Sequence, residues 1–273
     1  MKSKVLSLPY LVWSALFVII PLAIVFFFAF TSSDGGFTLE NFKNMFGLSY
    51  IFPTILLSFE LAFIATAISL LIGYPVAYIM SRMRAVGQRT MMMIIMIPMW
   101  MNFLLRTYGW MTILEDTGLL NKLFSLVGLG PFHMINTHGA VVLGMIYNYL
   151  PFMILPLYSV MEKIDKSVIE AAGDLGAGPL KVITRIVVPM SLPGIITGIT
   201  MVFVPSVSTF VLSKMLGGGS TMMIGDLIES KFIGSVYDPY LGSAISLVLM
   251  VVIIIMMGII NLFDNDEVEG IIA

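Results

Sequence analysis

The sequence predicts an all-α membrane protein that forms one domain, residues 1–273, with six transmembrane helices and both termini in the cytoplasm. Three observations predict this fold class. The 273 residues are 59% hydrophobic and only 11% charged, with a mean hydropathy of +1.01, whereas about a quarter of the residues of a soluble domain are charged. The apolar residues form six runs long enough to cross a bilayer, which takes about 20 residues. The basic residues between these runs are divided unequally between the two sides.

The six runs are poor in charge and are separated by polar segments. The predicted spans are residues 8–30, 54–80, 90–114, 139–161, 191–213 and 239–263. Glu60 lies within the second span and Arg106 within the third. In the fifth span, Gly194 and Gly198 have the G-x-x-x-G spacing that permits close contact between membrane helices.

The distribution of lysine and arginine predicts the orientation. With the N-terminus inside, the inner segments hold Lys2, Lys4, Arg82, Arg84, Arg89, Lys163, Lys166, Lys181 and Arg185. The outer segments hold only Lys43, Lys122, Lys214 and Lys231. This excess satisfies the positive-inside rule, which the inverted topology would violate. The segment between the fourth and fifth spans, about residues 165–189, is therefore predicted to be cytoplasmic.

The beginning of this cytoplasmic segment has the local signals of a capped helix. Ser167 and Glu170 fit the S-x-x-E capping box, and Asp165 is an alternative N-cap. Gly176 and Gly178 suit the left-handed turn with which many helices end.

A second short helix is expected directly afterwards. Pro179 suits the first position of a helix over about residues 180–188, which would place Lys181 and Arg185 one turn apart on one face. Two capped helices joined by a hinge indicate a docking surface. An amphipathic loop lying on the membrane surface is the alternative.

The same segment resembles the EAA loop of bacterial ABC importer permeases. Glu170-Ala171-Ala172 is followed by Gly176, Ile186 and Val188-Pro189 at the spacing of that family, whose signature ends in Leu-Pro instead. In the family this loop forms the coupling helix that docks into a groove on a separate ATPase subunit. The resemblance implies a type I importer transmembrane domain. It also implies a docking helix that includes Glu170, Ala171, Ala172, Asp174, Gly176 and Ala177.

Short motifs elsewhere resemble the spermidine/putrescine permeases and, among them, the B-type subunit. They lie at residues 71–75, 97–100, 105–109, 150–156, 164–165, 170–177 and 216–218. This resemblance implies a heterodimer with a second permease subunit in the bacterial cytoplasmic membrane. It further implies a cytoplasmic ATPase dimer, an extracytoplasmic substrate-binding protein and a polyamine substrate. Lys214 departs from the branch, because relatives often carry an acidic residue at that position.

No pattern in the sequence predicts catalysis by this chain itself. Residues 173–178 have the glycine spacing of a phosphate-binding loop but lack its lysine. His133 and His138 have no cysteines or clustered carboxylates nearby, so no metal site is expected. The chain has no cysteine, and its net charge of −2 does not indicate a nucleic-acid partner. We therefore expect a non-catalytic subunit without a cofactor, with ATP bound by the partner ATPase.

Polar and aromatic residues inside the spans are the candidates for a translocation path. Ionisable groups in a membrane usually face a cavity or pair with each other. Glu60 and Arg106 are therefore either an ion pair or separate, and in the second case Glu60 is the natural counter-ion of a cationic solute. Aromatic faces bind ammonium groups, although tyrosine and tryptophan also anchor helices at the interface. The candidate path residues are Glu60, Trp100, Asn102, Arg106, Tyr147 and Tyr149.

Two further functions remain as alternatives. In the first alternative, the same class of importer carries another small solute, such as an amino-acid derivative or an anion. Lys214 favours this alternative, because relatives that carry polyamines often have an acidic residue at its position. An autonomous secondary carrier belongs to a different class, and such carriers usually contain relays of membrane carboxylates and paired broken helices. Glu60 is the only carboxylate expected within the spans, so the sequence disfavours a carrier.

Overall fold

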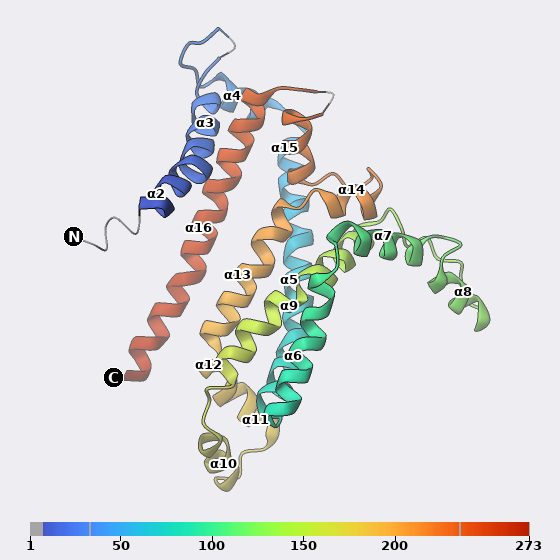
Figure 1. Ribbon diagram of the computed structural model, residues 1–273, viewed down its shortest axis with the longest axis vertical. Coiled ribbons are helices and arrows are strands. Elements are labelled where there is room, and N and C mark those ends of the chain that lie inside the picture. Colours follow the sequence, from blue (N-terminus) through green and yellow to red (C-terminus); the bar gives the residue numbers. More distant parts are fainter. Residues whose placement is uncertain (1–7, 33, 235, 273) are drawn as a thin grey trace.

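The structure, a computed structural model, describes residues 8–32, 34–234 and 236–272 (Figure 1). Within these ranges the regular structure is helical apart from one isolated β-bridge, between Thr31 and Phe37. Four helices are each long and apolar enough to cross a membrane. Two further pairs of helices, 85–100 with 103–126 and 179–190 with 192–208, are each joined by a sharp bend, and the number of candidate spans is six if each pair is counted as one span. The predicted fold class is confirmed. Lys2 and Lys4, which contribute to the predicted orientation, lie outside the described residues.

The first span consists of α2 (Leu8–Ser14), a π-helical turn (Ala15–Ile19) and α3 (Ile20–Ala29). Next come α4 (Glu40–Gly47), α5 (Ile51–Arg82), α6 (Ala85–Trp100), α7 (Phe103–Leu114), α8 (Leu119–Leu126) and α9 (His138–Met161). The coupling segment contains α10 (Lys166–Asp174), α11 (Pro179–Val182), a second π-helical turn (Ile183–Val187) and α12 (Val188–Met190). The chain ends with α13 (Leu192–Ser208), α14 (Val211–Gly217), α15 (Ile224–Phe232) and α16 (Pro239–Ile272).

The third predicted span, 90–114, is not one straight helix. The helix ends at Trp100, and the segment from Phe103 onward is turned by 90° relative to α6. The turn has a local cause. Pro98 lies in the last turn of α6, and the side chain of Asn102 accepts the backbone N–H groups of Leu104 and Leu105 at 2.9 and 3.3 Å. An N-cap of this kind starts a new helix, so the chain leaves the axis of α6 at this point.

The fifth predicted span, 191–213, is also shorter than expected. α13 ends at Ser208, and Val211 begins a separate short helix, α14. At the N-terminal end of the span, the helical segment 179–190 joins α13 at a bend of 71°. The second span is longer than predicted, because α5 begins at Ile51 and continues to Arg82.

The centre of the molecule is built from α5, α9 and α13, which pack against one another (Figure 1). Close approach of α9 and α13 depends on two glycines. A Cβ atom on Gly194 would lie 3.0 Å from the carbonyl oxygen of Pro156, and one on Gly198 would lie 2.7 Å from the sulfur of Met153. This is the close helix contact that the G-x-x-x-G spacing predicts.

Two buried hydroxyl side chains of α5 are satisfied within the helix. The Ser58 and Thr66 hydroxyls donate to the carbonyls four residues earlier, at 2.8 and 2.7 Å, which removes the cost of burying them unpaired. The Ser58 oxygen also accepts the N–H of Ile224 at 2.7 Å and so attaches the start of α15 to α5.

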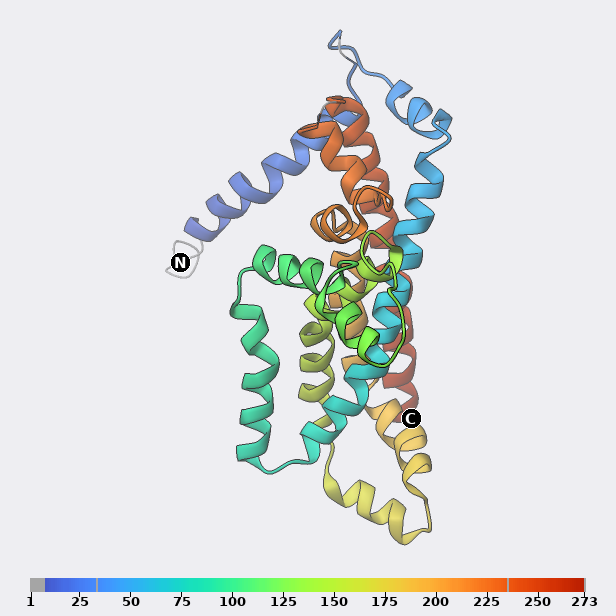
Figure 2. The same cartoon turned by 90° about the vertical axis from the view of Figure 1, so that its right-hand side faces the viewer.

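The two ends of the molecule differ in structure. α10 lies at one end of the bundle, whereas α4 and α15 lie at the other (Figures 1 and 2). α7 and α8 form an arm to one side, and the α2–α3 segment packs on α16 beside the central helices. With the orientation expected from the basic residues, α10 is at the cytoplasmic end and α15 at the outer end.

Candidate coupling loop and outer cavity

The coupling segment begins at Asp165, which is the N-cap of α10. Its carboxylate accepts the N–H of Ser167 at 3.0 Å. Of the two alternatives in the sequence, Asp165 is therefore the cap and Ser167 lies inside the helix. The hydrogen bond from the Ser167 backbone favours the charged carboxylate and lowers the pKa of Asp165.

The end of α10 is a Schellman motif centred on Gly176. The N–H of Gly176 donates to Gly173 O at 2.9 Å, and that of Ala177 donates to Ala172 O at 3.0 Å. Gly176 has a φ of +80°, a conformation that is costly for residues with a Cβ. Of the two glycines predicted to end the helix in a left-handed turn, Gly176 does so and reverses the chain toward α11, whereas Gly178 has a φ of −67° and is the N-cap of α11.

The two faces of α10 and of the turn that follows it differ. Ile169, Ala172 and Ala177 pack against the buried core under the segment. The outward face is exposed and consists of Glu170, Ala171, Asp174, Leu175 and Gly176. The sequence resemblance assigns Ala172 and Ala177 to the docking helix. In the structure they pack against the core and hold the exposed face in place. Leu175 was not expected at this site, yet 89% of its surface is exposed at the tip of the loop.

The second helix of the segment runs from Pro179 to Met190 and contains a π-helical turn, so it is longer than the predicted 180–188. Pro179 occupies the first helical position, as predicted. The helix ends at Ser191, which is fully buried and whose hydroxyl oxygen lies 3.0 Å from that of Tyr74 on α5. This contact attaches the bend before α13 to the central bundle.

Arg82 connects the inner end of α5 with the coupling segment. Its guanidinium donates to the carbonyl oxygen of Ile164 at 3.4 Å and lies 5.5 Å from the ring centre of Tyr78. Its Nε and Nη2 atoms are buried without a hydrogen-bond partner. Arg82 also lines a small cavity of about 250 Å³ together with Lys166, Ile169 and Glu170. Two basic side chains, Arg82 and Lys166, thus line the same small cavity as Glu170 of the predicted docking helix.

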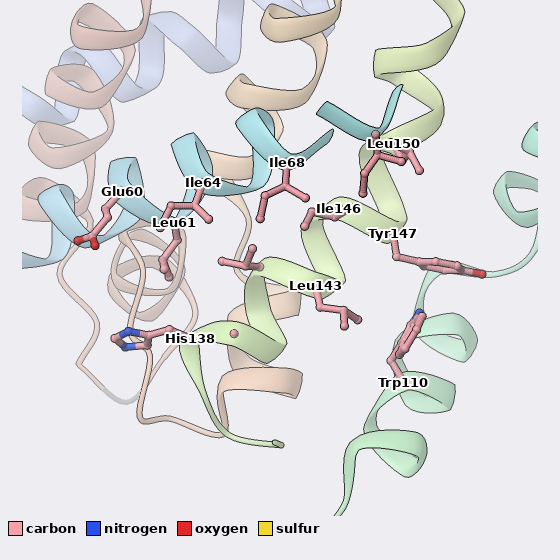
Figure 3. Close-up of a pocket in the computed structure, with 13 residues that line it drawn as sticks. Glu60, Leu61, Ile64, Ile68, Trp110, His138, Leu143, Ile146, Tyr147 and Leu150 are labelled. Atoms are coloured by element: carbon pink, nitrogen blue, oxygen red, sulfur yellow. The ribbon is translucent and has the colours of Figure 1, made fainter. Parts of the chain in front are cut away.

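A larger cavity, of about 750 Å³, lies between α5, α9 and α7 and is mostly apolar. Figure 3 shows Glu60 and His138 at one end of this cavity and Tyr147 and Trp110 at the other. The Trp110 and Tyr147 rings meet edge to face with 5.3 Å between their centres. The outer half of the chain therefore offers one carboxylate and two aromatic rings around a single apolar space.

The cavity contains only part of the candidate path. Glu60 and Tyr147 line it, whereas Trp100, Asn102, Arg106 and Tyr149 do not. Trp100 is 78% exposed at the end of α6, and Asn102 acts as a helix cap. Tyr149 packs against the core of the bundle. Trp110 and His138 were not predicted as path residues, because only the fold brings them to the same space as Glu60.

Glu60 and Arg106 both lie in the described part of the chain, and no ion pair joins them. The Arg106 guanidinium instead lies 6.0 Å from the ring centre of Tyr147. Its Nε and Nη1 atoms are buried and have no hydrogen-bond partner. The sequence left open whether Glu60 and Arg106 form an ion pair, and in the structure the two residues are separate.

Neither histidine belongs to a metal cluster. His133 is exposed and contacts Asp116 at 3.0 Å, and His138 lines the cavity. Among the residues that the structure describes, no three histidine or acidic side chains converge on a common point where a metal could bind.

The fold and the coupling segment define the membrane-spanning permease subunit of an ABC importer. The chain belongs to the family described as binding-protein-dependent transport system inner membrane components, which matches residues 69–267. It is therefore a multi-pass protein of the bacterial inner membrane and a non-catalytic subunit, as the sequence led us to expect.

Relatives of known function are similar over almost the whole chain. The spermidine/putrescine transport system permease protein PotB of Haemophilus influenzae is 37% identical over 94% of this chain and 93% of its own length. PotB of Escherichia coli is 34% identical, over 90% and 91% respectively. Among solved structures, a chain of a bacterial alginate ABC transporter in complex with its alginate-bound periplasmic protein has a TM-score of 0.79. It is 16% identical, and the match covers 95% of this chain and 92% of that one. This structural likeness shows a common fold.

Proposed function

We propose that this protein is the permease subunit of a polyamine importer and forms half of the translocation path. The observation that carries the proposal is the identity of 34–37% to two spermidine/putrescine permeases over at least 90% of the chain. The chemistry of the outer cavity supports it. A polyamine needs carboxylates for its ammonium groups and aromatic faces for cation–π contacts, each worth about 0.5–2 kcal/mol. Glu60, Tyr147 and Trp110 supply these groups around one space.

The coupling segment is the site at which an ATPase subunit binds. Its outward face is held in place by a cap at Asp165 and a Schellman motif at Gly176. Leu175 presents an apolar side chain to solvent at the tip of this face. Burying it in a groove of a partner would contribute about 1.5–3 kcal/mol, and Glu170 adds a charge on the same face.

The remaining partners follow from the importer class. A second, homologous permease forms the other half of the path, an ATPase dimer binds and hydrolyses ATP, and an extracytoplasmic binding protein delivers the solute. ATP binding closes the ATPase dimer and moves the coupling segments, which opens the path outward, and hydrolysis returns it to the inward state. The bend at Ser191 connects this movement to α13. We expect no cofactor on this chain itself, because ATP is bound by the partner ATPase.

A second candidate substrate is an anion. The unpartnered guanidinium atoms of Arg106 beside Tyr147 favour it, because buried donors without a partner attract a negatively charged group. A carboxylate of the second permease would satisfy the same atoms, so Arg106 is also compatible with a polyamine substrate.

The experiment is reconstitution of the complete complex in proteoliposomes, with ATP inside and labelled spermidine outside. We expect spermidine with its binding protein to stimulate ATP hydrolysis and to be taken up. Stimulation by an anion such as sulfate, without any response to spermidine or putrescine, would contradict the polyamine assignment.

Variants of the coupling segment test the ATPase site separately. Glu170→Lys, Gly176→Asp and Leu175→Asp should each abolish uptake and reduce co-purification of the ATPase, while membrane insertion remains normal. Ile233→Asp is the control, because Ile233 is 81% exposed but lies next to α15 at the opposite end. Normal uptake by the three variants would refute the docking role.

A further inference from the structure

The outer end of the molecule contains an ion pair that the candidate path does not include. Lys214 on α14 is paired with Glu229 on α15. The Lys214 ammonium also lies 6.0 Å from the ring centre of Phe210, one turn earlier on the chain. The lysine side chain is 49% exposed and that of Glu229 is 24% exposed, so solutes in water can reach the pair.

The surroundings of this pair favour a positive charge. Asp226 precedes Glu229 by three residues on α15, which places both carboxylates on one face of the helix. Asp226 is only 6% exposed, and its Oδ1 atom has no hydrogen-bond partner. Its other oxygen accepts the N–H of Met223 at 2.8 Å. Lys214 is therefore paired with one carboxylate and lies over an aromatic ring, and a second, incompletely satisfied carboxylate lies one turn earlier on α15.

The group held here has the same chemistry as the proposed substrate. Lysine carries a primary ammonium at the end of a flexible four-carbon chain, and one end of an alkyl diamine has the same structure. A carboxylate and an aromatic face each bind such an ammonium favourably. Lys214 is attached to the backbone at one end, so it can leave the site without leaving the protein.

We propose that Glu229 and Phe210 form an outer subsite for the terminal ammonium of a polyamine, and that Lys214 occupies this subsite until the substrate displaces it. The proposal rests on the proposed function, because it assumes a substrate with alkylammonium ends. The charge of Lys214 is neutralised in the empty state, and the ammonium of the solute takes its place on Glu229.

The displacement makes Lys214 a competitor of the substrate. Without Lys214, Glu229 is free, and the substrate binds without first displacing the lysine. An exposed ion pair contributes little, so the gain in affinity from removing the lysine is expected to be about two- to fivefold. Without Glu229, both the substrate and Lys214 lose their partner, and affinity for the substrate falls.

The test is equilibrium binding of labelled spermidine to the purified complex of both permeases and the ATPases. The binding protein is omitted, so that its own affinity does not enter the measurement. We expect Lys214→Met to lower the Kd about two- to fivefold, Glu229→Gln to raise it, and Lys214→Arg, which keeps the ion pair, to change it little. The double variant should have the Kd of Glu229→Gln, because Lys214 acts only through Glu229. All complexes are compared at the same elution volume in size-exclusion chromatography, which excludes misassembled variants.

Two results would overturn the proposal. One is an unchanged or higher Kd for Lys214→Met, which would make the ion pair a structural contact only. The other is an equal gain from Lys214→Met in the Glu229→Gln background, which would mean that the lysine repels the substrate at long range. If the wild-type complex takes up spermidine with its binding protein and either result is found, the subsite fails and the proposed function stands. If the wild-type complex does not take up spermidine at all, the proposed function fails and the subsite fails with it.

Discussion

The hydroxyl groups of Tyr74 and Ser191 lie 3.0 Å apart although 117 residues separate them in the sequence. Tyr74 is on α5, in the central bundle, and Ser191 lies at the 71° bend between the coupling segment and α13. Ser191 is fully buried. A movement of α10 to α12 must pass through this bend to reach α13, so the contact lies where the coupling segment joins the membrane helices.

We expect Tyr74→Phe and Ser191→Ala to uncouple ATP hydrolysis from transport. Each removes one hydroxyl of a hydrogen bond that contributes about 0.5–1.5 kcal/mol, and the bend is then less firmly attached to α5. The measurement is the ratio of substrate-stimulated to basal ATPase activity in the reconstituted complex, which should fall in both variants. The double variant should be no worse than either single one, because both remove the same interaction. Additive effects would show that the two hydroxyls act separately.

Gly176→Ala should weaken the coupling segment more than Gly178→Ala does. A Cβ atom at either position would meet nothing within 4 Å, but only Gly176 has a positive φ, of +80°. A left-handed conformation costs an L-residue about 1–2 kcal/mol, so the Schellman turn should open in part of the molecules. The fraction of ATPase that co-purifies with the permease measures the effect, with Gly178→Ala as the matched control. Equal losses in the two variants would mean that the turn conformation is unimportant.

The stability of the outer end should depend on the protonation of Asp226. Burial raises the pKa of this carboxyl above its ordinary value of 3.8, and the carboxylate of Glu229 raises it further. The side chain of Ser213, the N–H of Met223 and the ammonium of Lys214 oppose the shift. The folded protein therefore holds this proton more tightly than the unfolded chain does. The resulting stabilisation is fully present below pH 3.8 and is lost as the pH rises through the raised pKa of the folded state.

The check is the melting temperature in detergent as a function of pH, for the wild type and Asp226→Asn. The variant cannot titrate at this position, and its side-chain oxygen can still accept the N–H of Met223. We expect the melting temperature of the wild type to fall relative to that of the variant as the pH rises from about 4 toward neutrality. A constant difference across this range would indicate that Asp226 has an ordinary pKa.

Gly198→Ala should destabilise the contact between α9 and α13. Its Cβ would lie 2.7 Å from the sulfur of Met153 and 3.3 Å from the carbonyl oxygen of the same residue. Overpacking of this kind typically costs about 1–3 kcal/mol, and the melting temperature of the purified complex should fall. Gly258→Ala is the control, since a Cβ there meets nothing within 4 Å and alanine favours the helix. A melting temperature that is unchanged by Gly198→Ala would show that α9 can move away at no cost.

The sequence by itself determined the features that depend on neighbouring residues. The apolar runs predicted a helical membrane protein, because backbone groups in lipid must be satisfied within a helix. The caps of the coupling segment could also be predicted, since the left-handed turn at Gly176 and the start of a helix at Pro179 follow from local conformational preferences. The choice between Asp165 and Ser167 as the N-cap stayed open, because both side chains fit the local pattern and only the path of the backbone after α9 selects one.

The tertiary structure alone decided how distant residues meet. The cavity combines Glu60 of α5 with Trp110 of α7 and His138 of α9, and no spacing in the sequence indicates that these three share one space. The turn at Asn102 redirects α7, so Arg106 lies over Tyr147 and away from Glu60. The contacts of Tyr74 with Ser191 and of Lys214 with Glu229 likewise join separate helices. Such contacts depend on how apolar faces and small residues let whole helices pack, whereas the helices themselves depend on local sequence.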